Sequence, residues 1–212
     1  MDYDIPESVS QRGSGEETAE NRRIHEVADE LQRLCRLHEE ESGNGKANGG
    51  RFEIEQRVAE QYAKEHGIFP MDNVFDLGTP GPSGNENDTY VAKDTIYKVN
   101  NLLNSGGICK LLDKILLHNL IFPNTAYKIH GFTGYDGRTI MPVLEQERIC
   151  ESQPATQIMI DTYMAALGFE RDGETGRFKS ESYRVWDVVP RNVLVDKDGD
   201  MYVIDAEIAR NQ

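Results

Sequence analysis

The amino-acid sequence predicts a mixed α+β domain that is preceded by a helical N-terminal segment. Two observations indicate this class. Short runs of alternating apolar residues, bounded by turn signals, lie in the middle and at the end of the chain and are typical of antiparallel strands. Longer runs with an apolar residue every three or four positions are typical of helices. Hydrophobic residues make up 38% of the sequence and charged residues 28%, so we expect a packed core with polar extensions.

The N-terminal quarter divides into three segments by composition. Residues 1–20 are polar and rich in Ser, Gly and Glu, and we expect a disordered tail. Residues 21–41 carry apolar side chains at helical spacing and predict an amphipathic helix, which packs either on its own domain or on a protein partner. Residues 42–50 are rich in Gly and Asn and predict a flexible linker. We therefore expect a helical appendage and linker over 21–50 and the main domain over 51–212.

The first half of the main domain mixes helices with strands. The apolar periodicity and the turn signals predict helices over 52–66 and 102–119, and strands over 89–92, 95–99, 125–132 and 139–144. The second half continues in the same way. Its patterns predict a helix over 155–167, a polar loop over 170–180, a strand over 184–188, and a hairpin made of 192–195 and 201–204.

Charge and composition exclude several classes of function. The chain has 37 acidic and 23 basic residues and a net charge of -14, so phosphate backbones and anionic lipid surfaces would repel it. We therefore expect neither a nucleic-acid nor a membrane partner, and no apolar run approaches the roughly 20 residues that span a bilayer. The three cysteines form no Cys-x-x-Cys pair, which indicates neither a zinc site nor a disulfide framework. A cytoplasmic location is the expectation.

The most informative stretch lies near the C-terminus. Asp187 is followed five residues later by Asn192, then by the predicted hairpin, and Asp205 ends the second hairpin strand. A carboxylate in a turn can orient an attacking hydroxyl. The oxygens of Asn192 and Asp205 are hard ligands suited to Mg²⁺. Because the hairpin returns the chain, we expect these two ligands to meet at one end of a strand pair.

This order and spacing resembles the catalytic and metal-binding loops of the protein-kinase superfamily, where Asp-x-x-x-x-Asn precedes a strand ending in Asp-Phe-Gly. More narrowly, the chain resembles the kinase-like domains of polyvalent proteins from phages and conjugative elements. Four segments carry this narrower resemblance: Gly84-x-Glu86, Ile96-Tyr97-Lys98-Val99, His118-Asn119-x-x-Phe122-Pro123 and Gly131-Phe132. The resemblance implies a protein-kinase-like two-lobed fold, with a strand-rich N-terminal lobe over about 51–145 and an abbreviated C-terminal lobe over about 146–212.

The resemblance also implies roles for individual residues. Asp187 would be the catalytic aspartate, Asn192 and Asp205 would hold Mg²⁺, and Lys98 would bind the phosphates of ATP. The strand pattern around Lys98, taken alone, favours a solvent-facing lysine instead. Asp113 is the single acidic residue of the segment 102–119 and is a candidate partner for Lys98, although an exposed surface carboxylate fits the pattern equally well.

Two further segments are candidates for nucleotide contact. Gly78, Gly81 and Gly84 permit a close approach of the backbone to phosphates, with a plain surface turn as the alternative. The segment 144–147, which includes Glu145, is expected to follow the fifth strand, where backbone groups of a kinase hinge would hydrogen-bond adenine.

The sequence departs from the kinase pattern in ways that leave the function open. Ala206-Glu207 replaces Phe-Gly, and Gln212 stands only seven positions after Asp205, so we expect no activation segment. One interpretation is an ATP- and Mg²⁺-dependent phosphotransferase acting on a hydroxyl of a protein or small molecule. The first alternative is a pseudokinase that binds nucleotide or docks partners without catalysis. The second is a structural interaction protein that uses its N-terminal helices.

Overall fold

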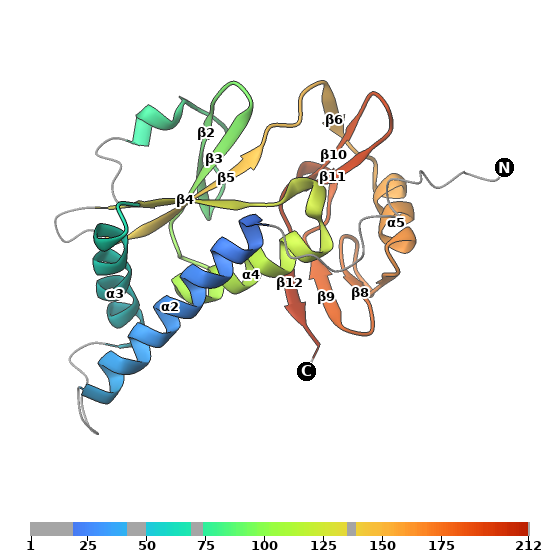
Figure 1. Ribbon diagram of the computed structural model, residues 1–212. Helices are drawn as coiled ribbons and strands as arrows, with labels where there is room; N and C mark the ends of the chain where they lie inside the picture. Colours follow the sequence, from blue (N-terminus) through green and yellow to red (C-terminus); the bar gives the residue numbers. More distant parts are fainter. Residues whose placement is uncertain (1–18, 42–49, 69–73, 135–138, 212) are drawn as a thin grey trace. The chain divides into compact units, whose positions relative to one another are not determined.

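The computed structural model describes residues 19–41, 50–68, 74–134 and 139–211 (Figure 1). Glu20–Cys150 form one compact unit, and the chain from Glu151 onward belongs to a second. Within the described residues there are four α-helices and three antiparallel sheets, so the predicted α+β class is confirmed. Most of the predicted tail and most of the predicted linker lie outside the described residues, and the last two residues of that tail, Ala19 and Glu20, already belong to a helix. None of the described helices is both long and apolar enough to cross a membrane.

Three helices of the first unit share one hydrophobic core. They are α2 (Ala19–Glu41), α3 (Arg51–Glu65) and α4 (Ile108–Ile121) (Figure 1). The apolar stripe of α2 is at most 3% exposed, and it packs with buried residues of α3, α4 and the sheet. Of the two interpretations of this helix, packing on its own domain is therefore the one the structure shows. The stripe consists of Ile24, Val27, Ala28, Leu31 and Cys35.

Helix α4 begins later than predicted. The apolar pattern predicts a start at residue 102, but the helix starts at Ile108. Leu102 has a φ of 61°, and Gly106 and Gly107 also have positive φ values. A helix cannot include these left-handed residues, so the segment before Ile108 forms turns instead.

The five-stranded sheet of the first unit has the order β1-β2-β3-β5-β4, and all of its pairings are antiparallel. Its strands are β1 (Thr79–Pro80), β2 (Asn87–Val91), β3 (Thr95–Asn100), β4 (Lys128–Thr133) and β5 (Met141–Glu147). The expectation that 144–147 follows the fifth strand is wrong, because β5 continues through Glu147, which pairs with Thr95. Gln146 is buried there and donates to the carbonyl oxygen of Thr125 over 2.6 Å, which favours the longer strand.

The N-terminus of α4 is capped by a side chain from another helix. Glu55 of α3 is 6% exposed, and its Oε2 accepts a hydrogen bond of 2.9 Å from the amide of Ile108. Arg51 pairs with the other carboxylate oxygen at 3.1 Å. A Cβ atom at Gly107 would lie 2.4 Å from Oε2 of Glu55, so glycine is required for this approach. Desolvation, reinforced by the nearby Glu55 carboxylate, raises the pKa of Cys109 to about 12, so this thiol stays protonated as a core residue.

Replacing Glu55 with Ala should lower the free energy of unfolding by about 1–3 kcal/mol, because the buried amide of Ile108 loses its acceptor. The quantity to measure is the urea unfolding midpoint. Glu55→Gln keeps an acceptor and should recover much of the loss. Glu60→Ala removes a half-exposed carboxylate that pairs with Lys64 on the same helix; it serves as the control and should change the midpoint little. Equal losses for the Ala and Gln variants of Glu55 would show that an uncharged acceptor at this position does not stabilise the start of α4.

The second unit consists of one described helix and two small sheets. The helix is α5 (Gln157–Ala166). One sheet has the order β11-β10-β6 and the other β12-β9-β8-β7. The strands are β6 (Ser152–Pro154), β7 (Glu170–Arg171), β8 (Phe178–Lys179), β9 (Tyr183–Trp186), β10 (Val193–Asp196), β11 (Met201–Val203) and β12 (Glu207–Arg210).

The β10–β11 hairpin is confirmed, and its turn is closed by Asp196. Oδ1 of this residue accepts hydrogen bonds from the amides of Asp198 and Asp200 at 3.0 and 2.9 Å. The prediction of a loop over 170–180 is wrong, because β7 and β8 pair there and Phe178, which is 1% exposed, faces Val185 of β9. A two-residue strand shows no periodicity in sequence, so its pairing depends on a distant partner.

Candidate functional site

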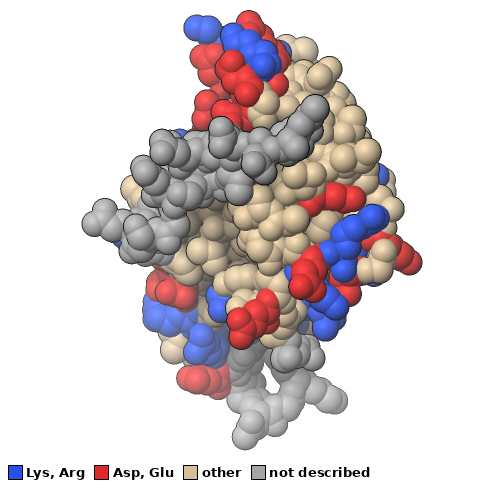
Figure 2. Space-filling model, turned by 90° about the vertical axis from the view of Figure 1, so that its right-hand side faces the viewer, with Lys and Arg blue, Asp and Glu red and all other residues tan. Residues whose placement is uncertain are grey.

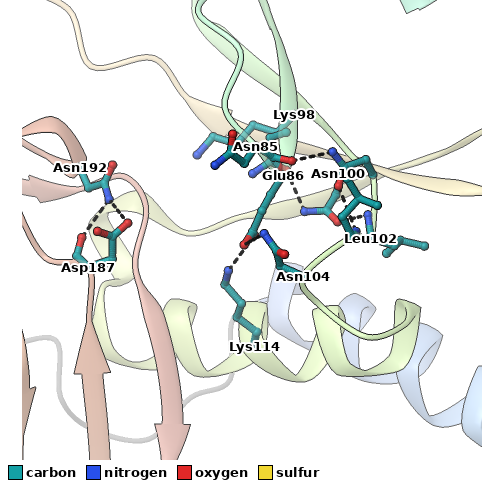
Figure 3. A network of polar contacts seen from close by, with 12 residues as sticks. Asn85, Glu86, Lys98, Asn100, Leu102, Asn104, Lys114, Asp187 and Asn192 are labelled. Carbon is teal, nitrogen blue, oxygen red and sulfur yellow. Dashed lines mark hydrogen bonds and ion pairs between the residues drawn. The ribbon is translucent and has the colours of Figure 1, made fainter.

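Asp187 and Asn192 are joined by direct hydrogen bonds in the second unit (Figure 3). The side-chain nitrogen Nδ2 of Asn192 donates to the backbone carbonyl oxygen of Asp187 over 2.9 Å and to the carboxylate oxygen Oδ2 of Asp187 over 2.8 Å. The short 3₁₀ helix η3 (Pro190–Asn192) turns the chain back for this contact. Arg191 forms an ion pair with Oδ1 of Asp187. Both oxygens of the Asp187 carboxylate are thus held in place by residues of its own loop.

The backbone of Asp187 is in an unfavourable conformation. Its φ is 61°, in the left-handed region that residues with a Cβ seldom adopt. Strained backbone of this kind gathers at functional sites, where the surrounding structure holds it in place. Here the hydrogen bonds from Asn192 and the end of β9 at Trp186 supply that support.

Asp205 is placed beside this pair by the hairpin. Val193 pairs with Val203, and the amide of Ile204 donates to the carbonyl oxygen of Asn192 over 2.9 Å. Asp205 is the next residue and is half-buried. The chain then enters β12, whose first residue pairs with Trp186, immediately before Asp187. Two ladders therefore bring the backbones of Asp187, Asn192 and Asp205 to neighbouring strand ends.

The chemistry of these three side chains suits a magnesium ion. Because the nitrogen of the Asn192 amide is bound to Asp187, its oxygen is the atom available to a cation. Asp205 adds a carboxylate, and Mg²⁺ commonly takes only one or two protein carboxylates beside phosphate and water oxygens. In the part of the chain that the structure describes, no group of three His, Cys, Asp or Glu side chains is arranged to hold a metal. One carboxylate and one amide oxygen fit a cation that takes its remaining ligands from phosphate and water.

In the first unit, Lys98 is buried. It lies on β3 between Thr89 of β2 and Leu144 of β5, and it is 7% exposed. Its Nζ donates to the hydroxyl of Tyr127 over 2.8 Å and lies 4.8 Å from the centroid of that ring. The solvent-facing alternative for this lysine is therefore wrong. Burying an ammonium group is costly unless polar partners surround it, and the hydroxyl of Tyr127 is one such partner.

The three candidate glycines have different surroundings. Gly81 and Gly84 lie in the loop that joins β1 to β2, whereas Gly78 precedes β1. A Cβ atom at Gly78 would lie 2.5 Å from the carbonyl oxygen of Val91, and one at Gly81 would lie 2.9 Å from Oγ1 of Thr89. Packing against β2 accounts for both residues. A Cβ at Gly84 would meet no described atom within 4 Å, so Gly84 is the one of the three that borders open space.

A polar network that the sequence did not reveal anchors the far end of this loop (Figure 3). The carboxylate of Glu86 accepts a 3.1 Å hydrogen bond from Asn104 and lies 3.5 Å from Nζ of Lys114 on α4. Asn101 donates to the carbonyl oxygens of Glu86 and Asn85 over 2.9 and 2.8 Å. The loop is thus fixed to the β3–α4 connection and to α4. The one sequence signal for it is the cluster of asparagines after the lysine strand.

The remaining two candidates lie on the first unit. Asp113 is exposed on α4, the placement expected of a surface carboxylate, whereas Lys98 is buried. Glu145 lies within β5, and its carboxylate is 3.2 Å from Nδ1 of His130 on β4. Its backbone is part of a strand paired on both sides, with Tyr97 and with Lys128.

Charges of both signs are interspersed on the face shown in Figure 2, where clusters of Lys and Arg adjoin clusters of Asp and Glu. The second unit contains several such pairs, including Lys197–Glu151 at 3.0 Å, Lys179–Asp172 at 3.4 Å and Arg171–Asp161 at 3.5 Å.

Comparison with known families gives the identity of the domain. Residues 53–212 match the family described as serine/threonine/tyrosine kinase found in polyvalent proteins. The chain belongs to this kinase family. No curated protein and no solved structure matches it. Membership indicates a kinase-like phosphotransferase domain, and such domains in general use a nucleotide and a metal ion. The match starts within α3, so helix α2 lies outside the matched residues. Helix α2 nevertheless packs into the core of the first unit.

Proposed function

We propose that this kinase transfers the γ-phosphoryl group of ATP, bound with Mg²⁺, to a hydroxyl group of a protein or small molecule. The observation that carries the proposal is the bonded pair Asp187–Asn192 with Asp205 on the adjoining hairpin end. In this proposal Glu20–Cys150 contain the strand-rich N-terminal lobe, and the unit from Glu151 onward is the abbreviated C-terminal lobe.

Each residue has a chemical role in the proposed transfer. Asn192 and Asp205 hold the cation, which supplies positive charge beside the phosphate oxygens. Lys98 places a further positive charge on the phosphates, and the backbone near Gly84 lies against them. Asp187 orients the acceptor hydroxyl and takes its proton. As it does so, the hydroxyl oxygen forms a bond to the γ-phosphorus, and the bond from that phosphorus to the departing ADP oxygen breaks.

One observation favours a second function, nucleotide binding without transfer. Arg191 and Asn192 both engage the carboxylate of Asp187, so an acceptor hydroxyl must compete with bonds that already exist. A pseudokinase that binds nucleotide and docks a partner would keep this arrangement. The two functions differ in one measurable respect, because only the phosphotransferase releases ADP from bound ATP.

The test is Asp205→Asn, compared with Asp198→Asn as a matched control on the exposed hairpin turn. Mg²⁺–ATP should raise the melting temperature of the natural chain and of the control, since a ligand that binds only the folded state stabilises it. Asp205→Asn should remove the part of this rise that depends on Mg²⁺, and chelation of the metal should do the same to the natural chain. An Asp205→Asn variant with unchanged metal-dependent binding and turnover would reject the assignment. Binding without ADP release in the natural chain would support the pseudokinase.

A further inference from the structure

The hydroxyl of Tyr127 is a buried hydrogen-bond partner of Lys98. Tyr127 is 6% exposed, and its oxygen accepts the 2.8 Å hydrogen bond from Lys98 Nζ. The two residues come from different elements, since Lys98 lies within β3 and Tyr127 directly precedes β4. The contact therefore depends on how the chain between α4 and β4 is held.

That chain is held by the segment His118-Asn119-x-x-Phe122-Pro123. The side chain of Asn119 bonds both backbone groups of Tyr127: Oδ1 accepts from its amide over 2.7 Å, and Nδ2 donates to its carbonyl oxygen over 2.8 Å. The ring of His118 packs edge-on against the ring of Tyr127, with 4.8 Å between centroids. Nε2 of His118 also lies 3.2 Å from Oγ1 of Thr125. Tyr127 is thus fixed at its backbone and at its ring.

A phenol hydroxyl is chemically suited to positioning a phosphate-binding lysine. An ammonium group has three hydrogen-bond donors, and the hydroxyl of Tyr127 accepts one of them. Because the phenol is neutral, Tyr127 directs the ammonium group without adding negative charge beside it. The ring of Tyr127 also attracts the cation through its π-electrons. Tyr127 therefore orients the ammonium group of Lys98 without neutralising its charge.

We propose that Tyr127 is a positioning residue for Lys98, and that Asn119 fixes Tyr127 so that the end of α4 controls phosphate binding. This inference rests on the proposed function, in which Lys98 binds the phosphates of ATP. It gives the His118-Asn119-x-x-Phe122-Pro123 segment a role that the composition of the segment does not suggest.

The test is Tyr127→Phe in the full chain, because it removes the hydroxyl and keeps the ring against His118. The dissociation constants of Mg²⁺–ATP and of adenosine are measured by calorimetry, and the urea midpoint confirms that each variant folds. Tyr127→Phe should weaken binding of Mg²⁺–ATP about tenfold, as expected for loss of a hydrogen bond to a charged group, and leave adenosine binding unchanged. Tyr90→Phe removes a hydroxyl from another buried tyrosine, on β2, and should change neither of the two dissociation constants. In a Lys98→Met background, Tyr127→Phe should have no further effect on Mg²⁺–ATP binding.

The outcomes separate this inference from the proposed function. If the natural chain binds Mg²⁺–ATP and Lys98→Met weakens it, but Tyr127→Phe matches Tyr90→Phe, the positioning role is overturned and the function stands. Equal weakening of Mg²⁺–ATP and adenosine by Tyr127→Phe would also overturn it, since the defect would then be general. If the natural chain does not bind Mg²⁺–ATP at all, both the proposed function and this inference are wrong.

Discussion

Replacing Asp187 with Asn should slow phosphoryl transfer by about 10²- to 10⁴-fold, the contribution typical of a positioned general base. The amide cannot take up the proton of the acceptor hydroxyl. Asn is the suitable replacement because it tolerates the left-handed backbone that residue 187 adopts, with its φ of 61°. Its carbonyl oxygen can still accept one hydrogen bond, from Arg191 or from Asn192, so the loop should keep its shape. The measurement is ADP formation at saturating Mg²⁺–ATP.

Nucleotide binding by the Asp187→Asn variant should remain close to that of the natural chain, because the proposed phosphate and metal ligands are other residues. Asp198→Asn is the control for the loss of one carboxylate from the same unit, and it should leave the rate unchanged. An Asp187→Asn variant that transfers phosphate at the natural rate would show that this residue is not the base. A variant that loses nucleotide binding as well would place Asp187 among the metal ligands.

Replacing Leu31 with Ala should lower the free energy of unfolding of the first unit by about 2–5 kcal/mol, as for other large buried side chains truncated in a packed core. Leu31 is 2% exposed on α2 and belongs to the same core as α3, α4 and the sheet. The cavity would open in a region that lies outside the matched kinase residues. The measurement is urea unfolding followed by circular dichroism.

Leu37 provides a matched control on the same helix, because it is 41% exposed. Leu37→Ala makes the same chemical change without opening a buried cavity, and it should alter the unfolding midpoint by a small fraction of the Leu31→Ala effect. Equal effects of the two substitutions would mean that α2 does not contribute its apolar stripe to the core. Helix α2 would then behave as an appendage, as its composition alone suggests.

The parts of the fold that were predicted correctly are those with a strong local pattern. Residues 21–41 and 52–66 repeat their apolar side chains over several turns, and they form α2 and α3 within two residues of the predicted ends. The β10–β11 hairpin carries its own turn chemistry in Asp196 and Gly199. The parts that were missed depend on remote partners. Strands β7 and β8 are two residues long, and they exist because Phe178 is buried opposite Val185.

The candidate site divides in the same way. Asp187, Asn192 and Asp205 lie within one loop and one hairpin, so their relative placement follows from spacing and strand register. The burial of Lys98 and its bond to Tyr127, 29 positions away, have no counterpart in the local pattern. The anchoring of Glu86 by Lys114, 28 positions away, is of the same kind.

The sequence by itself determined the class of the domain, its kinase family and the order of its chemical groups, because short-range periodicity and residue spacing are properties of the chain alone. The tertiary structure decided which side chains are buried and which bonds they form. Lys98 lies on a strand whose alternation would equally suit a solvent-facing lysine, but in the folded chain it is buried and bonded to Tyr127, which Asn119 of α4 holds. Desolvation and hydrogen bonding between distant segments exist only after the chain has folded, and they determine the surroundings and the hydrogen-bond partner of that lysine.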